Sequence, residues 1–220
     1  MQALPLEPHA ASRRGFALLE RHDDRGDIKL TGIPKSFSRS CEVFVEGGAP
    51  DFVYQVISGA VCASRMLSDG RRQITDFYLP GDVFGLEFGS ERRSGAEALS
   101  EGSVVVARRS AMMADGEVGA RLWRHAVSEL QRSQEHVVTL GRRSATERVA
   151  SFLIELSHRL DDADEFELPM TRQDIADYLG LTIETVSRTL TQFQALHYVR
   201  LQSCRQIEIV RRDDLEDLCQ

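Results

Sequence analysis

The pattern that most constrains the fold lies between residues 170 and 193, near the C-terminus. Thr171 is followed three residues later by Asp174, the spacing of a capping box, which predicts the start of a helix. Gly180 supplies a tight turn, and Thr182 is placed to cap a second helix. Two short helices joined by a glycine turn are typical of the helix-turn-helix unit.

The second of these helices has two chemically different sides. Its apolar residues recur at i, i+4 and i+7 and predict a buried stripe: Val186, Leu190 and Phe193. A different side, near the helix N-terminus, carries Glu184, Ser187 and Arg188. Arginine can bridge guanine O6 and N7, glutamate can accept from cytosine N4, and serine can donate or accept, so this side suits base reading in a major groove. The alternative is a solvated face on which Glu184 and Arg188 only form an ion pair.

Positive charge and helix caps surround the second helix. We expect four residues to hold DNA phosphates: Arg172, Thr182, Thr185 and Arg205. Residues 168–212 contain six arginines against four acidic residues, a local charge of +2 within a chain of net charge −7. Segments 199–202 and 206–210 alternate polar and apolar residues around a short turn, which predicts a wing. Together these features predict binding to double-stranded DNA.

The rest of the chain divides into regions of different character. Residues 1–28 are polar and broken by Pro and Gly, so we interpret them as an N-terminal extension. Residues 29–115 contain short β-rich runs and turn signals such as Asp69-Gly70, and predict a small antiparallel barrel or sandwich. Residues 116–142 predict a long helix, and residues 143–220 complete the winged domain, with an acidic surface linker at 161–165. The predicted fold class is α+β.

The long helix contains a narrow apolar stripe. Its members follow steps of four, four, seven and three residues: Leu122, Ala126, Leu130, Val137 and Leu140. A thin stripe on a long helix is typical of two helices that pair, so we expect this one to form a homodimer. The alternative is that the stripe only packs against the β-rich domain of its own chain.

Composition excludes several other classes of protein. No segment approaches the roughly 20 apolar residues of a membrane span, and the N-terminus lacks the apolar core of a signal peptide, so we expect a cytoplasmic protein without membrane contacts. The four cysteines are scattered without metal-ligand spacing, and no nucleophile–base pair or phosphate loop stands out, so we expect neither a cofactor, a metal nor an enzyme. Cys204 lies beside Arg205 in the predicted wing turn and is a candidate redox thiol; the alternative is an inert thiol.

Three segments together resemble the cyclic-AMP receptor/fumarate-nitrate-reduction (Crp/Fnr) superfamily. They are the paired helices at 170–188, the LPGDVFG run at 79–85 and the TERVASFL run at 146–153. The resemblance implies a β-roll of the cyclic-nucleotide-binding jelly-roll type, a dimerisation helix and a C-terminal winged helix-turn-helix. Glu184, Ser187 and Arg188 match the fumarate-nitrate branch, which implies a palindrome of TTGA-type half-sites. The resemblance also implies contact with RNA polymerase and activation of transcription.

At two places the sequence departs from the family pattern, and these departures indicate which branch of the superfamily it resembles. No cysteine precedes Cys41, so the iron–sulfur cluster of the oxygen-sensing members is not expected. The arginine and serine of the cyclic-nucleotide phosphate run are displaced to Arg93 and Ser94. The combination resembles the FixK-type branch, which implies control of low-oxygen, respiratory or nitrogen-fixation genes without a known cofactor. The alternative is a regulator gated by a cyclic nucleotide or another small molecule in the β-roll.

Overall fold

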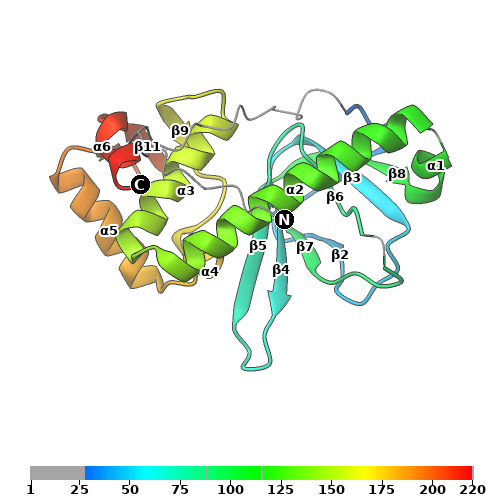
Figure 1. Ribbon diagram of the computed structural model, residues 1–220, viewed down its shortest axis with the longest axis horizontal. Coiled ribbons are helices and arrows are strands. Elements are labelled where there is room, and N and C mark those ends of the chain that lie inside the picture. Colours follow the sequence, from blue (N-terminus) through cyan, green and yellow to red (C-terminus); the bar gives the residue numbers. More distant parts are fainter. Residues whose placement is uncertain (1–27, 88, 115, 220) are drawn as a thin grey trace, which may run out of the picture.

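The computed structural model describes residues 28–87, 89–114 and 116–219 (Figure 1). Its N-terminal half contains two four-stranded antiparallel sheets. One sheet has the order β1 (Ile33–Phe37), β8 (Gly102–Arg108), β3 (Phe52–Ser58), β6 (Val83–Phe84). The other has the order β2 (Glu42–Phe44), β7 (Gly95–Ala98), β4 (Val61–Met66), β5 (Arg72–Tyr78). The N-terminal extension expected over residues 1–28 lies outside the described residues, apart from the buried Ile28.

The two sheets enclose one apolar core. Val56 and Phe84 from the first sheet share a buried cluster with Val61 and Ala98 from the second. Buried and half-buried residues alternate along β7, as expected of a sheet with one buried face, whereas β3 and β4 contain consecutive buried residues. Gly70, at φ +84°, forms the predicted tight turn between β4 and β5. The predicted β-roll is confirmed.

A short helix, α1 (Arg109–Ala114), leads into the long helix α2 (Gly116–Arg142). At 1.5 Å per residue, α2 is about 40 Å long, and it runs from the β-roll to the C-terminal helices (Figure 1). Its first half packs on the β-roll, because Leu122 lies in a buried cluster with Val53 and Val83. His125 Nε2 lies 2.8 Å from the carbonyl oxygen of Val83 and donates to it. No helix of the described residues is both long enough and apolar enough to cross a membrane.

The C-terminal domain combines four helices with a small sheet. The helices are α3 (Ala145–Arg159), α4 (Arg172–Leu179), α5 (Ile183–Ala195) and α6 (Arg212–Asp217). The sheet has the order β10 (Val199–Leu201), β11 (Gln206–Ile209), β9 (Glu165–Glu167), so the predicted wing is confirmed. The acidic segment expected to be a linker ends in β9, because Phe166 is buried and pairs with Ile207 of the wing. Strand pairing therefore overrides the charged composition there.

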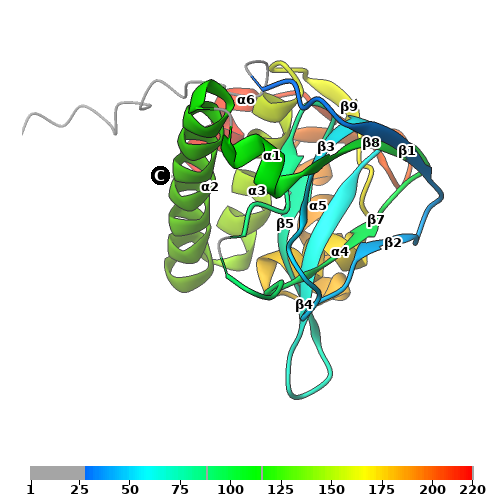
Figure 2. The same cartoon turned by 90° about the vertical axis from the view of Figure 1, so that its right-hand side faces the viewer.

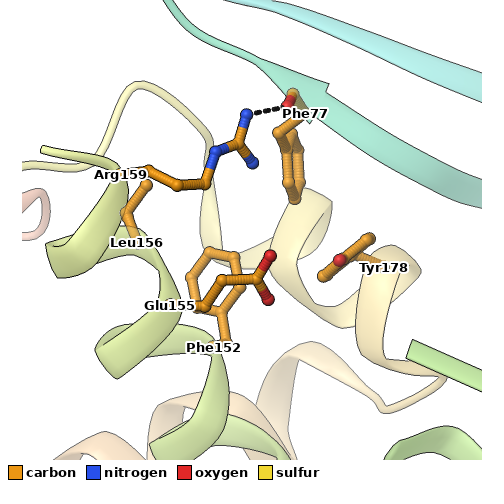
Figure 3. A pocket seen from close by; sticks show the side chains of 6 residues that line it. All are labelled: Phe77, Phe152, Glu155, Leu156, Arg159 and Tyr178. Carbon is orange, nitrogen blue, oxygen red and sulfur yellow. Dashed lines mark hydrogen bonds between the residues drawn. The ribbon is translucent and has the colours of Figure 1, made fainter. Parts of the chain in front are cut away.

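One buried apolar cluster extends from the β-roll into the C-terminal domain. Ile74 and Phe77 of β5 lie in the same buried cluster as Phe152 of α3 and Tyr178 of α4. Figure 3 shows a small recess at this junction, partly open to solvent, with walls from β5, α3 and α4. Arg159 closes one side by donating to Phe77 O at 2.5 Å. Seen from the side, α2 lies along one side of the β-roll (Figure 2).

Candidate nucleic-acid interface

Local hydrogen bonds build the paired helices. Thr171 is the N-cap of α4: its hydroxyl accepts from Asp174 N at 3.1 Å, and the Asp174 carboxylate accepts from Thr171 N at 2.8 Å. Helix α4 ends at Gly180, whose φ of +62° is the left-handed conformation that favours glycine. Thr182 caps α5 by accepting from Thr185 N at 3.3 Å. The predicted caps and turn are confirmed.

Helix α5 separates its core side from its exposed side as predicted. The core side is at most 1% exposed and consists of Val186, Leu190 and Phe193. Glu184 and Arg188 are exposed, and Ser187 is half-buried. These three side chains therefore lie away from the domain core, at the N-terminal half of a helix anchored by its opposite side.

The exposed charges of α5 do not neutralise each other. Glu184 and Arg188, both described, form no ion pair; Arg188 Nη2 instead lies 3.5 Å from Thr185 Oγ1. Hydrogen bonds from the backbone N–H of Glu184 and from the Thr182 hydroxyl hold the pKa of the Glu184 carboxyl below its ordinary value. Glu184 is thus an ionised acceptor at neutral pH, and Arg188 keeps its donors for another partner.

The four expected phosphate ligands lie in three places. Thr182 and Thr185 lie together at the N-terminus of α5, where helix N–H groups point outward. Arg172 is half-buried at the start of α4, and its Nε atom is buried without a hydrogen-bond acceptor among the described residues. Arg205 lies in the wing turn and is half-buried. Their role toward phosphate stays a prediction.

The cysteines differ in accessibility. Cys204 is exposed in the wing turn, where the sequence places the candidate redox thiol. Cys62 is buried within β4, and burial raises the pKa of its thiol to about 12. A thiol with so high a pKa is almost entirely protonated at neutral pH, and such a thiol is unreactive. Among the described residues, no cluster of His, Cys, Asp and Glu is arranged to hold a metal.

The apolar stripe of α2 needs a correction. Leu122 is 1% exposed because it packs into the β-roll of its own chain, so its assignment to the dimer interface is wrong. Ala126 and Leu140 are half-buried, whereas Leu130 and Val137 are 58% and 65% exposed.

Three further exposed apolar residues extend the outer stripe of α2. They are Trp123, Val127 and Val138. The steps from residue 123 to 127, 130 and 137 are four, three and seven, which is the spacing of a coiled-coil seam. That spacing is visible in the sequence, so the seam could have been found by testing each register against the bulky side chains. The exposed apolar surface thus keeps Leu130 and Val137 of the predicted stripe and adds Trp123, Val127 and Val138 in place of Leu122.

Comparison with known proteins agrees with both domains. The cyclic nucleotide-binding domain family matches residues 34–114, and the Crp-like helix-turn-helix domain family matches residues 147–218. The chain is 42% identical to the nitrogen fixation regulation protein FixK of Azorhizobium caulinodans, over 98% of this chain and 90% of that protein. It is 43% identical to FixK of Rhizobium meliloti, over 81% of this chain and 83% of that protein.

A solved structure has the same arrangement. The structure of FixK2 from Bradyrhizobium japonicum superposes with a TM-score of 0.82 at 44% identity, covering 86% of this chain and 98% of that chain. The identity extends through both domains, and the helix-turn-helix carries the predicted caps and exposed side. The chain belongs to the Crp/Fnr family of helix-turn-helix transcription regulators, in its FixK-type branch.

Proposed function

We propose that this regulator acts in the cytoplasm as a homodimer that binds a palindrome of two TTGA-type half-sites. Helix α5 of each copy enters the major groove of one half-site, and the two helices lie about one DNA turn, roughly 34 Å, apart. The base-reading residues are Glu184, Ser187 and Arg188. The phosphate-binding residues are Arg172, Thr182, Thr185 and Arg205.

The observation that carries this proposal is the division of α5 into two sides. Val186 and Phe193 anchor the helix in the core, while Glu184 and Arg188 stay exposed and unpaired with each other. An exposed arginine can donate two hydrogen bonds to guanine, and an ionised glutamate can accept from cytosine N4. Each good base contact is worth about 1–3 kcal/mol of discrimination, enough to select a site.

The outer stripe of α2 supports pairing of two copies. Trp123 and Leu130 are 63% and 58% exposed, and large apolar residues exposed in a row usually mark an interface. Because α2 reaches the C-terminal domain, pairing along it relates the two helix-turn-helix units by a two-fold axis. A two-fold protein matches an inverted repeat in DNA, so the proposed site is a palindrome.

The names of the relatives support a role in low-oxygen or nitrogen-fixation genes. One is a nitrogen fixation regulation protein, and another, 32% identical, is an anaerobic regulatory protein of Haemophilus influenzae. We propose activation through contact of exposed β-roll loops with RNA polymerase. Transcription in vitro from a promoter that carries the site should rise on addition of the protein. No rise, or a fall, would overturn activation.

The surroundings of Arg92 and Arg93 favour a β-roll that is not gated by a cyclic nucleotide. Arg93 is exposed, and its backbone N–H donates to the Glu87 carboxylate at 3.2 Å. The neighbouring Arg92 is 3% exposed, stacks 3.8 Å over the Phe44 ring and donates to Phe52 O at 2.6 Å. The buried Arg92 guanidinium thus already contacts groups of the protein itself, and the geometry does not favour gating by the phosphate of a cyclic nucleotide.

Selection of bound sites from random DNA by the full-length protein tests the proposed function. The expected product is an inverted repeat that contains TTGA-type half-sites at one spacing. Recovery of sequences without a repeat would overturn the dimeric palindrome. Recovery of no common sequence would overturn specific binding.

A further inference from the structure

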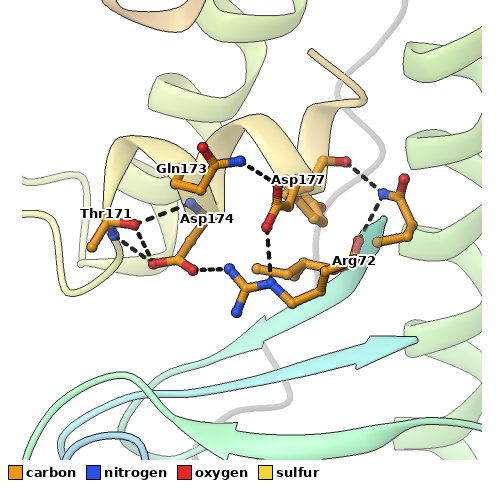
Figure 4. A network of polar contacts seen from close by, with 8 residues as sticks. Arg72, Thr171, Gln173, Asp174 and Asp177 are labelled. Carbon is orange, nitrogen blue, oxygen red and sulfur yellow. Dashed lines mark hydrogen bonds and ion pairs between the residues drawn. The ribbon is translucent and has the colours of Figure 1, made fainter. Parts of the chain in front are cut away.

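The β4–β5 hairpin contacts the helix that precedes α5. Arg72, at the start of β5, donates through Nε to Asp177 Oδ2 at 2.8 Å and through Nη2 to Asp174 (Figure 4). The next residue, Gln73, donates through Nε2 to Tyr178 O at 3.2 Å. Two consecutive residues of the β-roll therefore hold three residues of α4.

These contacts are well shielded from solvent. The side chains of Arg72, Asp174 and Asp177 are 27%, 9% and 15% exposed. Burial acts to raise the pKa of the Asp174 carboxyl, but hydrogen bonds from Thr171 and Arg72 outweigh it and the pKa lies below its ordinary value. The carboxylate that closes the capping box of α4 is thus also the carboxylate that binds the β-roll.

A second arginine holds the C-terminal end of α4. Arg148 of α3 donates to Leu179 O at 3.0 Å, to Leu140 O at 2.6 Å and to Arg143 O at 2.9 Å. Leu179 is the last residue of α4, Leu140 belongs to the last turn of α2, and Arg143 follows α2 directly. One guanidinium therefore ties the end of the long helix to the turn before α5.

We infer that Arg72 and Arg148 are positioning residues that set the separation of DNA half-sites which the dimer accepts. The inference rests on the proposed function, in which α2 defines the two-fold axis. Because α4 is held along its length to the β-roll and at its C-terminal end to α2, the direction of α5 relative to that axis is fixed. One base pair added between half-sites shifts the second by about 3.4 Å and turns it by about 34°. A rigidly held α5 cannot follow that change.

The experiment compares binding to DNA that differs only in half-site spacing. Full-length protein is titrated with the selected palindrome, with palindromes one base pair shorter and one and two longer, and with an isolated half-site. The variants are Arg72→Gln, the milder Asp177→Asn and Arg148→Gln. Arg71→Gln is the matched control, because Arg71 is the adjacent residue and, within the part of the chain that the structure describes, its side chain pairs with Asp69 on its own hairpin.

The wild type and Arg71→Gln are expected to prefer one spacing strongly. In Arg72→Gln the penalty for a one-base-pair change should shrink by roughly tenfold, and Asp177→Asn and Arg148→Gln should flatten the profile in the same direction. Affinity for the isolated half-site should stay within about twofold, since no base contact is removed. Thermal unfolding of each variant verifies that it is folded under the binding conditions.

Two results would overturn the inference in distinguishable ways. If the folded Arg72→Gln and Asp177→Asn variants lose affinity equally at every spacing and keep the wild-type profile, the ion pairs only stabilise the fold. If the wild type itself shows no preference for a palindrome, the proposed function fails as well, and the inference fails with it.

Discussion

Leu122 and Trp123 are neighbours on α2 and face different directions, about 100° apart around the helix axis, with 1% and 63% of their surfaces exposed. Leu122 packs with Val53 and Val83 of the β-roll, whereas Trp123 begins the outer apolar stripe. One helix therefore has two apolar faces with different tasks. The inner face packs on the β-roll, and the outer face carries the exposed residues that we propose to pair with a second copy.

Substitutions on the two faces should have different effects. Leu130→Asp places a charge on the outer stripe and is expected to give a folded monomer in sedimentation experiments. Leu122→Ala leaves a cavity in the β-roll contact and should cost about 2–5 kcal/mol of folding stability while the folded protein stays dimeric. A dimeric Leu130→Asp protein at micromolar concentration would argue against pairing through this stripe.

Arg188 and Arg172 should differ in what they contribute to DNA binding. Arg188→Ala is expected to lose about 1–3 kcal/mol on the palindrome and most of its preference over random DNA, because a base contact is removed. Arg172→Ala should weaken binding to both DNAs alike and reduce the salt slope by about one, because a phosphate contact is removed. Titrations at several salt concentrations measure both. Equal losses on both DNAs for Arg188→Ala would contradict base reading.

Gly180→Ala should destabilise the protein through backbone conformation alone. A Cβ at Gly180 would lie 3.7 Å from Arg148 Nη1 and 3.8 Å from Leu140 Cδ2, which is ordinary contact, so space is available. The φ of +62° costs a residue with a Cβ about 1–2 kcal/mol. The melting temperature should fall by about 2–4 °C for each kcal/mol. Gly180→Asn should lose less, because asparagine tolerates this region better; equal losses would implicate packing instead.

Glu129 on the inner side of α2 should make stability depend on pH. Burial, with Asp76 and Asp82 nearby, raises the pKa of its carboxyl to about 8, against the opposing effects of Arg132 and Arg159. An unfolded glutamate ionises near pH 4.5, so the folded state binds the proton more tightly. The stability from this group is fully present below pH 4.5 and is lost as the pH rises toward 8.

Glu129→Gln therefore should be neutral near pH 4.5 and should raise the melting temperature progressively up to pH 8. Each kcal/mol recovered corresponds to about 2–4 °C. Glu135→Gln removes the same charge from an exposed position on α2 and is the matched control. A gain that is equal at all pH values would show that the carboxyl is not the cause.

Cys204 provides a test of redox sensitivity. Oxidation of this exposed wing thiol to an acidic form would add negative charge next to the proposed phosphate contact of Arg205 and should weaken DNA binding. DNA affinity is measured before and after peroxide treatment, with Cys204→Ser as the control. Unchanged wild-type affinity, or the same loss in the serine variant, would exclude the thiol as the sensor.

Much of the proposed DNA-binding face follows from short-range pattern. The capping box of Thr171 and Asp174 and the turn at Gly180 depend on residues at most four positions apart. The two sides of α5 follow from the periodicity of that one helix. Hydrogen bonds and periodicity at that range are local, so they can be read along the chain. The predicted β-roll and wing were likewise visible as alternating apolar runs.

Contacts between residues that are far apart in the sequence could not be predicted from local pattern. Phe166 joins the wing across about forty residues, and local pattern does not reveal that the linker predicted at 161–165 ends inside β9, at Glu165. Periodicity placed a stripe on α2 but could not say which register meets the β-roll, because either side of the helix offers apolar residues. In the sequence, the arginine and serine of the family's phosphate-binding run are displaced. The burial of Arg92 against Phe44 could not be predicted, because it depends on how β2 and β7 pair in the β-roll.

The sequence alone determined that this chain contains a helix-turn-helix with a polar, charged recognition side, since that unit is built from neighbouring residues. Only the tertiary structure decided how the unit is held. Arg72 meets Asp177 across 105 positions, and Arg148 joins the ends of α2 and α4. Such pairs form only when packing brings distant elements together. Their formation therefore depends on the free energy of packing the whole core and not on the preferences of any one segment.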